Sequence, residues 1–458
     1  MSNAQYLWSV ARGLRTQVRP SVTDARARDA LDNGVRILTS VANALEWDPA
    51  ADGSLVDTDR LGGPPENAAA HRETGQAIAS AAAGLDAGLP PAMARDVIAW
   101  EKALLDAALT RIDAVERAGP ASGDTGVSII DPARLQTYLR QLPGCADVEI
   151  TTFRLIAGGR SRQTALFSIS GGSDLPADMV IQRGIPGQAG SAAFLGEAAQ
   201  HALLSRLHAA GMRVPRPVLV EEGLGWLDAP FLLSEQVPGA PVQPDYWLPA
   251  DDEQVVLGLA REMALLHAQS VDGVGAGLHA PRGAGGDWPA ELEELASAWT
   301  DNAHWPSITM SAAIAWLRAH DGDLDDRRAI VHNDMLFHNI LAQDGAITAV
   351  LDWEQCAIGH PGEDLGYCYP AVIAVTDWSR FMQAYRGAGG ADIPQRQIDY
   401  FALRAGLRLM KLVMAGGRDS FEKGLSDDVL VASAGAHFTQ RLLHRIALTL
   451  HSILERDA

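Results

Sequence analysis

Four polar side chains in one short stretch are the first candidates for chemistry. His332, Asp334 and Asn339 follow a short apolar run, and Asp352 ends a second one. We predict a strand, a loop and a strand here, which would bring both carboxylates and the amide together. Mg²⁺ with phosphate oxygens requires such oxygen ligands, and a second carboxylate can orient a hydroxyl nucleophile and accept its proton. Asp and Asn are also common in turns, but the combined spacing is rare by chance.

Three motifs in this region resemble a known superfamily. H-x-D-x-x-x-x-N, L-D-W-E and G-x-P-x-x-D-L are similar to segments of the aminoglycoside phosphotransferases and choline kinases, which are small-molecule kinases with the protein-kinase-like fold. The resemblance implies ATP as the phosphoryl donor and Asp334 as the catalytic base. It further implies that Asn339 and Asp352 hold Mg²⁺. Asp364 would brace the catalytic loop, and His332 would be structural, packed under that loop.

A Gly-rich turn between two predicted strands is the candidate phosphate-covering loop. It contains Gly158, Gly159 and Ser161. Glycines let the backbone approach phosphates, and its N–H groups can cradle anions. A hairpin turn is the commoner origin of a Gly-Gly pair, but the position of this one before the other motifs favours the phosphate loop. G-G-x-S-x-x-T and residues 214–239 also resemble the kinase-like domains attached to some acyl-CoA dehydrogenases.

The cation that should contact the nucleotide phosphates is harder to assign. Kinases pair a basic residue on the next strand with a Glu on the following helix. Glu197 is the helix candidate, with a solvated helix charge as the alternative. On the strand, Gln182 aligns with the basic position and Arg183 follows it. A shift of one residue turns a side chain to the other face of a strand. Either Arg183 takes the role through a bulge, or binding relies on backbone and metal, with Arg160 and Arg162 as substitutes.

The remaining contacts would involve adenine and the acceptor. Backbone groups of Glu235 and Val237, where the two lobes join, would contact adenine. Near the C-terminus a basic amphipathic helix carries Arg404 and Arg408, which could meet an anionic acceptor such as a coenzyme A phosphate. A solvated basic edge is the simpler interpretation of these arginines. Many antibiotic-modifying relatives carry a His where this chain has Leu336, which weakens an antibiotic acceptor.

The elements that must position these residues divide into three parts. Residues 1–125 have the apolar periodicity of a helical bundle. Residues 126–239 favour an antiparallel sheet, which would be the N-lobe with the phosphate loop and hinge. Residues 240–458 favour a helical C-lobe with the catalytic loop, metal site and acceptor site. We therefore expect an α+β fold, and the family resemblance implies that it is two-lobed and kinase-like. The additional N-terminal helical domain would serve homodimerisation or complete the acceptor site.

Composition narrows the class of partner. The chain has 458 residues, with 37 Lys+Arg against 57 Asp+Glu, so its net charge is −20. This balance argues against nucleic acid and anionic membranes as partners, because both need basic surfaces. A hydrophobic share of 47% excludes wholesale disorder. The sequence has no apolar run of about 18 residues and no signal-peptide pattern. Three cysteines favour reduced thiols in a cytoplasmic protein.

The function that these observations favour is ATP-dependent transfer of the γ-phosphoryl group to a hydroxyl of a small molecule. The acceptor would be a hydroxyacyl-CoA-like metabolite or an aminoglycoside- or macrolide-like compound. A nucleotide-binding pseudokinase, acting as a regulatory or interaction module, is the alternative, because Gln182 occupies the basic position. A metal-dependent hydrolase fits poorly, since it gives no role to the Gly-rich turn or Glu197.

Overall fold

The chain forms two compact units, each assembled from separate stretches of sequence. The sheet unit comprises Gly123–Gly286 and Asp326–Asp392, and the helical unit comprises Met1–Ser122, Asp287–Asp325 and Ile393–Ala458. The computed structural model describes residues 7, 10–23, 28, 31–32, 34–35, 38, 91–116, 130–156, 162–172, 174–184, 194–243, 250–273, 278, 288–302, 307–416 and 429–456.

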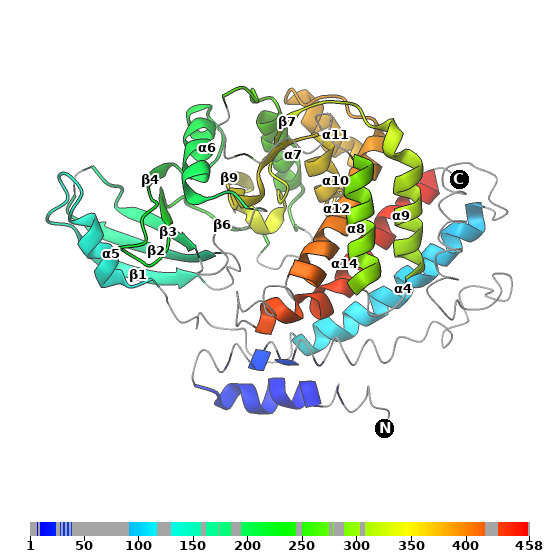
Figure 1. The fold of residues 1–458 in the computed structure, drawn as a ribbon, viewed down its shortest axis with the longest axis horizontal. Coiled ribbons are helices and arrows are strands. Elements are labelled where there is room, and N and C mark those ends of the chain that lie inside the picture. The colour runs from blue at the N-terminus through cyan, green and yellow to red at the C-terminus, as the bar shows by residue number, and fades with distance from the viewer. Residues whose placement is uncertain are drawn as a thin grey trace. The chain divides into compact units, whose positions relative to one another are not determined.

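A five-stranded antiparallel sheet forms one part of the sheet unit, in the order β1-β2-β3-β5-β4. Its strands are β1 (Glu149–Ile156), β2 (Arg162–Ser170), β3 (Asp178–Gly184), β4 (Pro217–Glu221) and β5 (Phe231–Glu235). Alternate side chains of β2 (Ala165, Phe167 and Ile169) are buried in a core that also takes residues of α5 (Pro132–Leu139). Helix α6 (Glu197–Ala209) packs beside β4 and β5 (Figure 1).

The second part of the sheet unit combines short strands with helices. Strands β6 (Ala240–Pro241), β8 (Ile340–Gln343) and β9 (Ala346–Val350) form one small sheet, and β7 (Ala329–Val331) pairs with β10 (Ala357–Gly359). The helices here are α7 (Glu253–His267), α10 (Gly362–Val372) and α11 (Trp378–Gly387). Asp344 and Gly345, both with positive φ, form the tight turn between β8 and β9. The turn and a register shift between Leu341 and Ala342 together align the two ends that carry Asn339 and Asp352.

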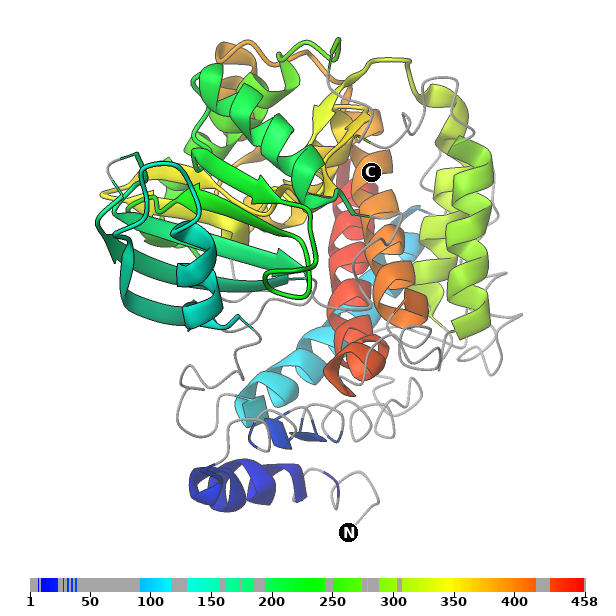
Figure 2. The ribbon, with the colours of Figure 1, turned by 60° about the vertical axis from the view of Figure 1, so that its left-hand side comes forward.

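The helical unit packs long helices against each other. They are α4 (Pro91–Glu116), α8 (Trp288–Asn302), α9 (Ile308–His320), α12 (Gln395–Lys411) and α14 (Val429–Arg456). Helix α14 lies along α4, and it also packs on α9 and α12 (Figure 2). At Gly406 of α12 a Cβ atom would stand 2.4 Å from Cγ1 of Ile446, so only glycine permits this close approach of α12 and α14.

A buried glutamate joins α4 to the helices that come later in the chain. Glu101 is 2% exposed. Its Oε1 accepts a hydrogen bond from Oγ of Ser307 at 2.7 Å, and its Oε2 accepts one from the Thr309 amide at 2.7 Å. These groups form the start of α9, where free N–H groups favour a negative charge. Burial raises the pKa of Glu101, and the hydrogen bonds act in the opposite direction.

The antiparallel sheet followed by a mainly helical part is confirmed. The expected boundaries near residues 125 and 239, and the N-terminal bundle as a separate domain, stay predictions. Residues 39–90 and 117–129, which include the first boundary, lie outside those that the structure describes. Cys145, Cys356 and Cys368 are buried and form no disulfide. Within the described ranges, no helix is both long enough and apolar enough to cross a bilayer.

Candidate active site

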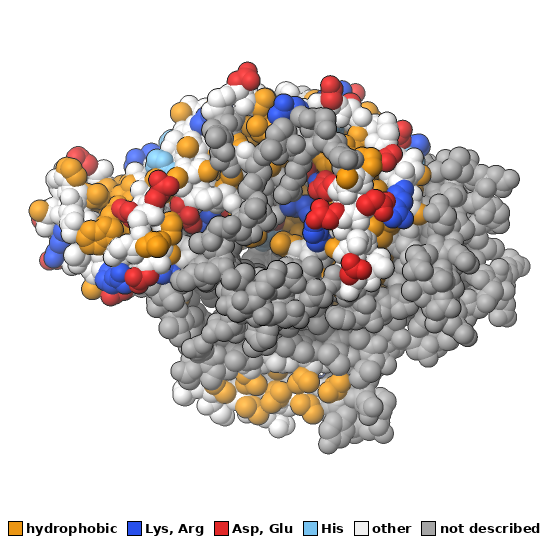
Figure 3. Space-filling model, in the orientation of Figure 1, with side chains coloured by type: hydrophobic (Ala, Val, Ile, Leu, Met, Phe, Trp, Pro, Cys, Tyr) orange, Lys and Arg blue, Asp and Glu red, His pale blue; other side chains and the backbone are white. Residues whose placement is uncertain are grey.

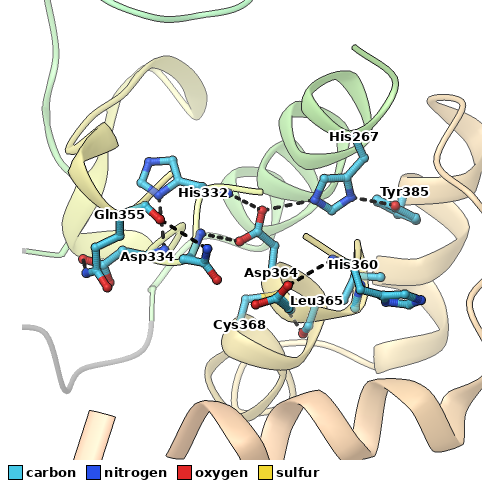
Figure 4. Close-up of polar contacts among 12 residues, drawn as sticks. His267, His332, Asp334, Gln355, His360, Asp364, Leu365, Cys368 and Tyr385 are labelled. Carbon is cyan, nitrogen blue, oxygen red and sulfur yellow. Dashed lines mark hydrogen bonds and ion pairs between the residues drawn. The ribbon is translucent and has the colours of Figure 1, made fainter. Parts of the chain in front are cut away.

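Three side chains contact Asp334, the predicted catalytic base. It lies in the loop after β7, and the Tyr367 hydroxyl donates to its Oδ1. Nε2 of Gln355 donates to its Oδ2 at 3.2 Å (Figure 4). Nε2 of His338 lies 3.6 Å from its Oδ1. Its side chain is 12% exposed, so this carboxylate is fixed in orientation and still has an accessible edge.

The charge state of Asp334 follows from these neighbours. Burial by itself would raise its pKa, but the contacts from His338 and Tyr367 outweigh burial and lower it. The side chain is therefore a carboxylate at neutral pH. An ionised carboxylate can only accept hydrogen bonds, so a substrate hydroxyl that approaches it must act as the donor.

Asp364 holds the backbone of the same loop. It lies on α10, is fully buried, and its Oδ2 accepts from the His332 amide at 2.8 Å and its Oδ1 from the Asn333 amide at 2.7 Å. Nε2 of His267, on α7, lies 3.1 Å from Oδ2, and Nδ1 of His267 lies 2.8 Å from the Tyr385 hydroxyl (Figure 4). Asn333 has φ of 64°, a left-handed conformation that these two amide contacts help to maintain.

The His332 ring links the loop that carries Asp334 to the backbone at Leu351. The Asp334 amide donates to its Nδ1 at 3.2 Å, so Nδ1 carries no hydrogen. Nε2 must then carry it, and it lies 2.9 Å from the carbonyl oxygen of Leu351. Burial lowers the pKa of His332, which matches this neutral tautomer. The ring also packs on Trp353 at 4.5 Å between centroids.

Asn339 and Asp352 lie where the β8–β9 hairpin begins and ends. The Leu351 amide donates to the Asn339 carbonyl at 2.8 Å, which extends the pairing of the two strands. Nδ2 of Asn339 donates to the Asp334 carbonyl at 2.9 Å, so its Oδ1 points to the other side of the amide group. Asp352 has φ of 61°. Burial and the charge of Asp334 raise the pKa of Asp352 to about 6.

This donor set fits Mg²⁺. The ion takes oxygen ligands and usually only one or two protein side chains, with water and phosphate oxygens completing its shell. An amide oxygen and a carboxylate meet that requirement, and a cation here would relieve the repulsion between Asp352 and Asp334. Among the described residues there is no cluster of three or more His, Cys, Asp or Glu side chains suited to a metal, the arrangement that a dedicated transition-metal site would need.

Two charged residues expected to bind the nucleotide, Glu197 and Arg183, have different partners. Glu197 begins α6, and its Oε1 accepts from Nε of Arg162 at 3.2 Å. Arg183 is buried elsewhere, where it donates to the carbonyls of Leu227 and Gly184 at 2.7 and 2.9 Å. The structure therefore brings Glu197 together with Arg162, and it directs Arg183 to backbone carbonyls.

The other predicted nucleotide contacts are less fully described. Glu235 ends β5, its amide donates to the Arg216 carbonyl at 2.9 Å, and its carboxylate pairs with the Arg216 guanidinium. Val237 follows two residues later and is partly exposed. The phosphate-loop residues Gly158, Gly159 and Ser161 lie outside the described residues.

The acceptor candidates Arg404 and Arg408 belong to α12 of the helical unit. The Arg404 side chain is 4% exposed, pairs with Glu291 at 2.7 Å and lies over the Trp288 ring. Arg408 follows one turn later and is partly buried. Charged side chains of both signs gather over α8 in Figure 3. Helix α8 also carries Glu293, which pairs with Arg318. A role of Arg404 and Arg408 in acceptor binding stays a prediction.

Sequence reasoning missed three neighbours of Asp334: Tyr367, Gln355 and His338. Tyr367 follows Asp364 by three residues on α10, so helical spacing puts both on one face. That spacing was a usable signal. His338 stands four residues after Asp334, and Gln355 follows Asp352 by three, but neither spacing is distinctive in an irregular loop.

Comparison with known families gives one match over most of the sheet unit and beyond. A family model described as "Phosphotransferase enzyme family" matches residues 152–401. Acyl-CoA dehydrogenase family member 11 of Rattus norvegicus is 26% identical over 196 residues, which are 40% of this chain and 24% of that protein. The Homo sapiens protein of that name is 28% identical over 199 residues, 39% of this chain and 24% of that protein. The matches thus span about a quarter of the length of these relatives.

A solved structure shares the fold. It is a Ralstonia eutropha protein described as an aminoglycoside phosphotransferase, and it aligns with a TM-score of 0.52 at 18% identity. The alignment covers 71% of this chain and 98% of that one. At this identity the likeness concerns the fold alone. It confirms the expected kinase-like arrangement of an antiparallel sheet followed by a helical part.

Proposed function

The chain belongs to the phosphotransferase enzyme family, and from this premise we propose that it transfers the γ-phosphoryl group of ATP to a hydroxyl of a small molecule. One observation carries the proposal. Asp334 is an oriented, ionised carboxylate, and Asn339 and Asp352 lie together at the ends of the adjacent hairpin. A base beside a pair of hard oxygen ligands is the arrangement that phosphoryl transfer to an alcohol needs.

In this proposal each residue has a distinct task. Asp334 accepts a hydrogen bond from the acceptor hydroxyl and orients its oxygen toward the γ-phosphorus. It takes the hydroxyl proton as the new P–O bond forms, while the bond from the γ-phosphorus to the β,γ-bridging oxygen breaks and ADP leaves. Asn339 and Asp352 would hold Mg²⁺, which neutralises phosphate charge when bound. Asp364 and His332 keep the loop backbone in position, through the amides of His332 and Asn333 and through the Leu351 carbonyl. Most of the acceleration then comes from positioning and charge.

We propose that the acceptor is a hydroxylated acyl-CoA or a similar anionic metabolite. The support is the relatives' name, acyl-CoA dehydrogenase family member 11, together with the match in sequence. An aminoglycoside-like acceptor is the second candidate, supported by the description of the Ralstonia protein. Leu336, where antibiotic-modifying relatives often carry His, favours the first candidate.

A nucleotide-binding pseudokinase is the alternative hypothesis, because Gln182 occupies the basic position. Asp334, Asn339 and Asp352, however, are all present in an ordered arrangement, which a purely regulatory site does not need. We therefore favour the enzyme.

An acceptor screen tests the proposal. The full chain is incubated with Mg·ATP and either hydroxyacyl-CoAs or aminoglycosides, and ATP consumption, thermal shift and the mass of the acceptor are measured. We expect steady ATP consumption with one set and the gain of one phosphoryl group by that acceptor. Nucleotide binding without consumption in either set would support the pseudokinase.

A further inference from the structure

A buried ion pair lies between the start of β2 and the start of α6. Nε of Arg162 lies 3.2 Å from Oε1 of Glu197, and the two side chains are 9% and 11% exposed. Nη2 of Arg162 also donates to the Leu195 carbonyl at 2.7 Å. A charge that is buried to this degree needs a partner and a fixed geometry. Arg162 is therefore held in one place by the segment that leads into α6.

The register of β2 and β3 defines which face of the sheet Arg162 occupies. Arg162 pairs with Gly184, Gln163 with Arg183 and Thr164 with Gln182. Directly opposite residues share a face, and so do alternate residues along a strand. Arg162 and Gln182 thus lie on one face, and Arg183 lies on the other. Gln182 is uncharged at the strand position where kinases carry a basic residue. Arg162 lies on the same face of the sheet, two residue pairs further along the β2–β3 ladder.

Arg162 also reaches the segment that follows β9. Its Nη1 lies 3.7 Å from Oε2 of Glu354, which is two residues after Asp352. The Leu195 amide donates to the Glu354 carbonyl at 2.7 Å, so the two segments are joined through the backbone as well. Arg162 therefore contacts the segment that carries Asp352, the proposed magnesium ligand.

We propose that Arg162 is the cation that contacts the nucleotide phosphates, carried on β2 in place of a basic residue on β3, with Glu197 as the residue that positions it. This assignment rests on the proposed function. A guanidinium has five N–H donors in a planar fork that suits phosphate oxygens. The hydrogen bonds to Glu197 and Leu195 use two of them. Three further N–H donors remain, two of them on Nη1, which lies at ion-pair distance from Glu354, and these can donate to a phosphate oxygen.

The test compares nucleotides that differ only in their phosphates. Calorimetric titration of the full chain with Mg·ATP, Mg·ADP and adenosine gives the affinity that the phosphates add. We expect Arg162→Gln to weaken ATP and ADP binding by about ten- to hundred-fold, the value of a charged hydrogen bond or two, and to leave adenosine unchanged. Arg134→Gln, which removes an exposed arginine paired with Asp228 in the same unit, is the matched control and should bind all three like the unmodified chain.

A double variant that moves the positive charge from β2 to β3 makes the test specific. Gln182→Lys in the Arg162→Gln background places a cation on the same face of the sheet, and we expect it to restore a large part of the ATP affinity. If Arg162→Gln does not fold, Arg162→Lys replaces it; that variant keeps the charge and loses the fork, and ATP binding should weaken several-fold.

The possible outcomes distinguish the role of Arg162 from the proposed function. Unchanged ATP affinity in the folded Arg162 variants, beside normal ATP binding by the unmodified chain, would overturn the role of Arg162 alone. Failure of the unmodified chain to bind ATP more tightly than adenosine would overturn the proposed function and this assignment together.

Discussion

The Tyr367 hydroxyl donates a hydrogen bond to Oδ1 of Asp334, so a side chain of α10 orients the carboxylate proposed as the catalytic base. Tyr367 is 1% exposed and does not depend on solvent for its position. The same helix also carries Asp364, which holds the amides of the loop. Helix α10 therefore fixes both the backbone and the side chain at the proposed reaction centre.

Tyr367→Phe should lower turnover by about ten- to hundred-fold, because Asp334 loses an orienting donor while the loop stays in place. ATP affinity should change little, since the hydroxyl acts on the proposed base. Steady-state kinetics with the acceptor found by the screen, together with nucleotide titration, would measure both. Tyr138→Phe, on α5 of the same unit, is the control. Equal turnover in the two variants would contradict an orienting role for Tyr367.

The buried His332 ring should make stability depend on pH. Burial lowers its pKa below the ordinary 6.5, so the unfolded chain binds this proton more readily than the folded chain. The contribution of the neutral ring is complete above about pH 6.5 and is lost as the pH falls below that value. Urea unfolding between pH 7 and pH 5 should show a falling free energy, with a shallower slope in His332→Gln. The same slope in both chains would remove His332 from this account.

Glu101 should be worth more to stability than an exposed glutamate of the same unit. Glu101→Ala leaves the Ser307 hydroxyl and the Thr309 amide without their partner, at a cost of about 2–3 kcal/mol. Glu293→Ala breaks an exposed pair with Arg318 and should cost under about 1 kcal/mol. Chemical denaturation of both variants measures the difference. Similar losses of unfolding free energy in the two variants would mean that Glu101 does not stabilise the packing of α4.

The proposed reaction centre was predictable because it is local. Asp334 and Asn339 share one loop, and Asp352 lies at the far end of the hairpin that follows. A short loop between paired strands leaves few alternatives for the placement of such residues. The antiparallel sheet was predictable for a related reason, because the alternation along β2 matches its buried residues.

The rest depends on contacts that sequence spacing does not encode. His267 and Asp364 are 97 positions apart, so their contact follows from the packing of whole helices. The partner of Glu197 depends on strand register, which decides that Arg162 shares a face with Gln182 and that Arg183 does not. A shift of one residue would reverse that result.

The most direct measurement is phosphoryl transfer by Asp334→Ala with the acceptor that the screen identifies. ³¹P NMR follows ATP, ADP and the phosphorylated acceptor, while calorimetry follows Mg·ATP binding. Asp344→Asn, at the exposed turn between β8 and β9, is the control. We expect Asp334→Ala to bind Mg·ATP about as well as the unmodified chain. It should transfer the phosphoryl group about 10²–10⁴-fold more slowly, as expected for loss of a general base. Transfer by Asp334→Ala at the rate of the control would contradict the proposed role of Asp334.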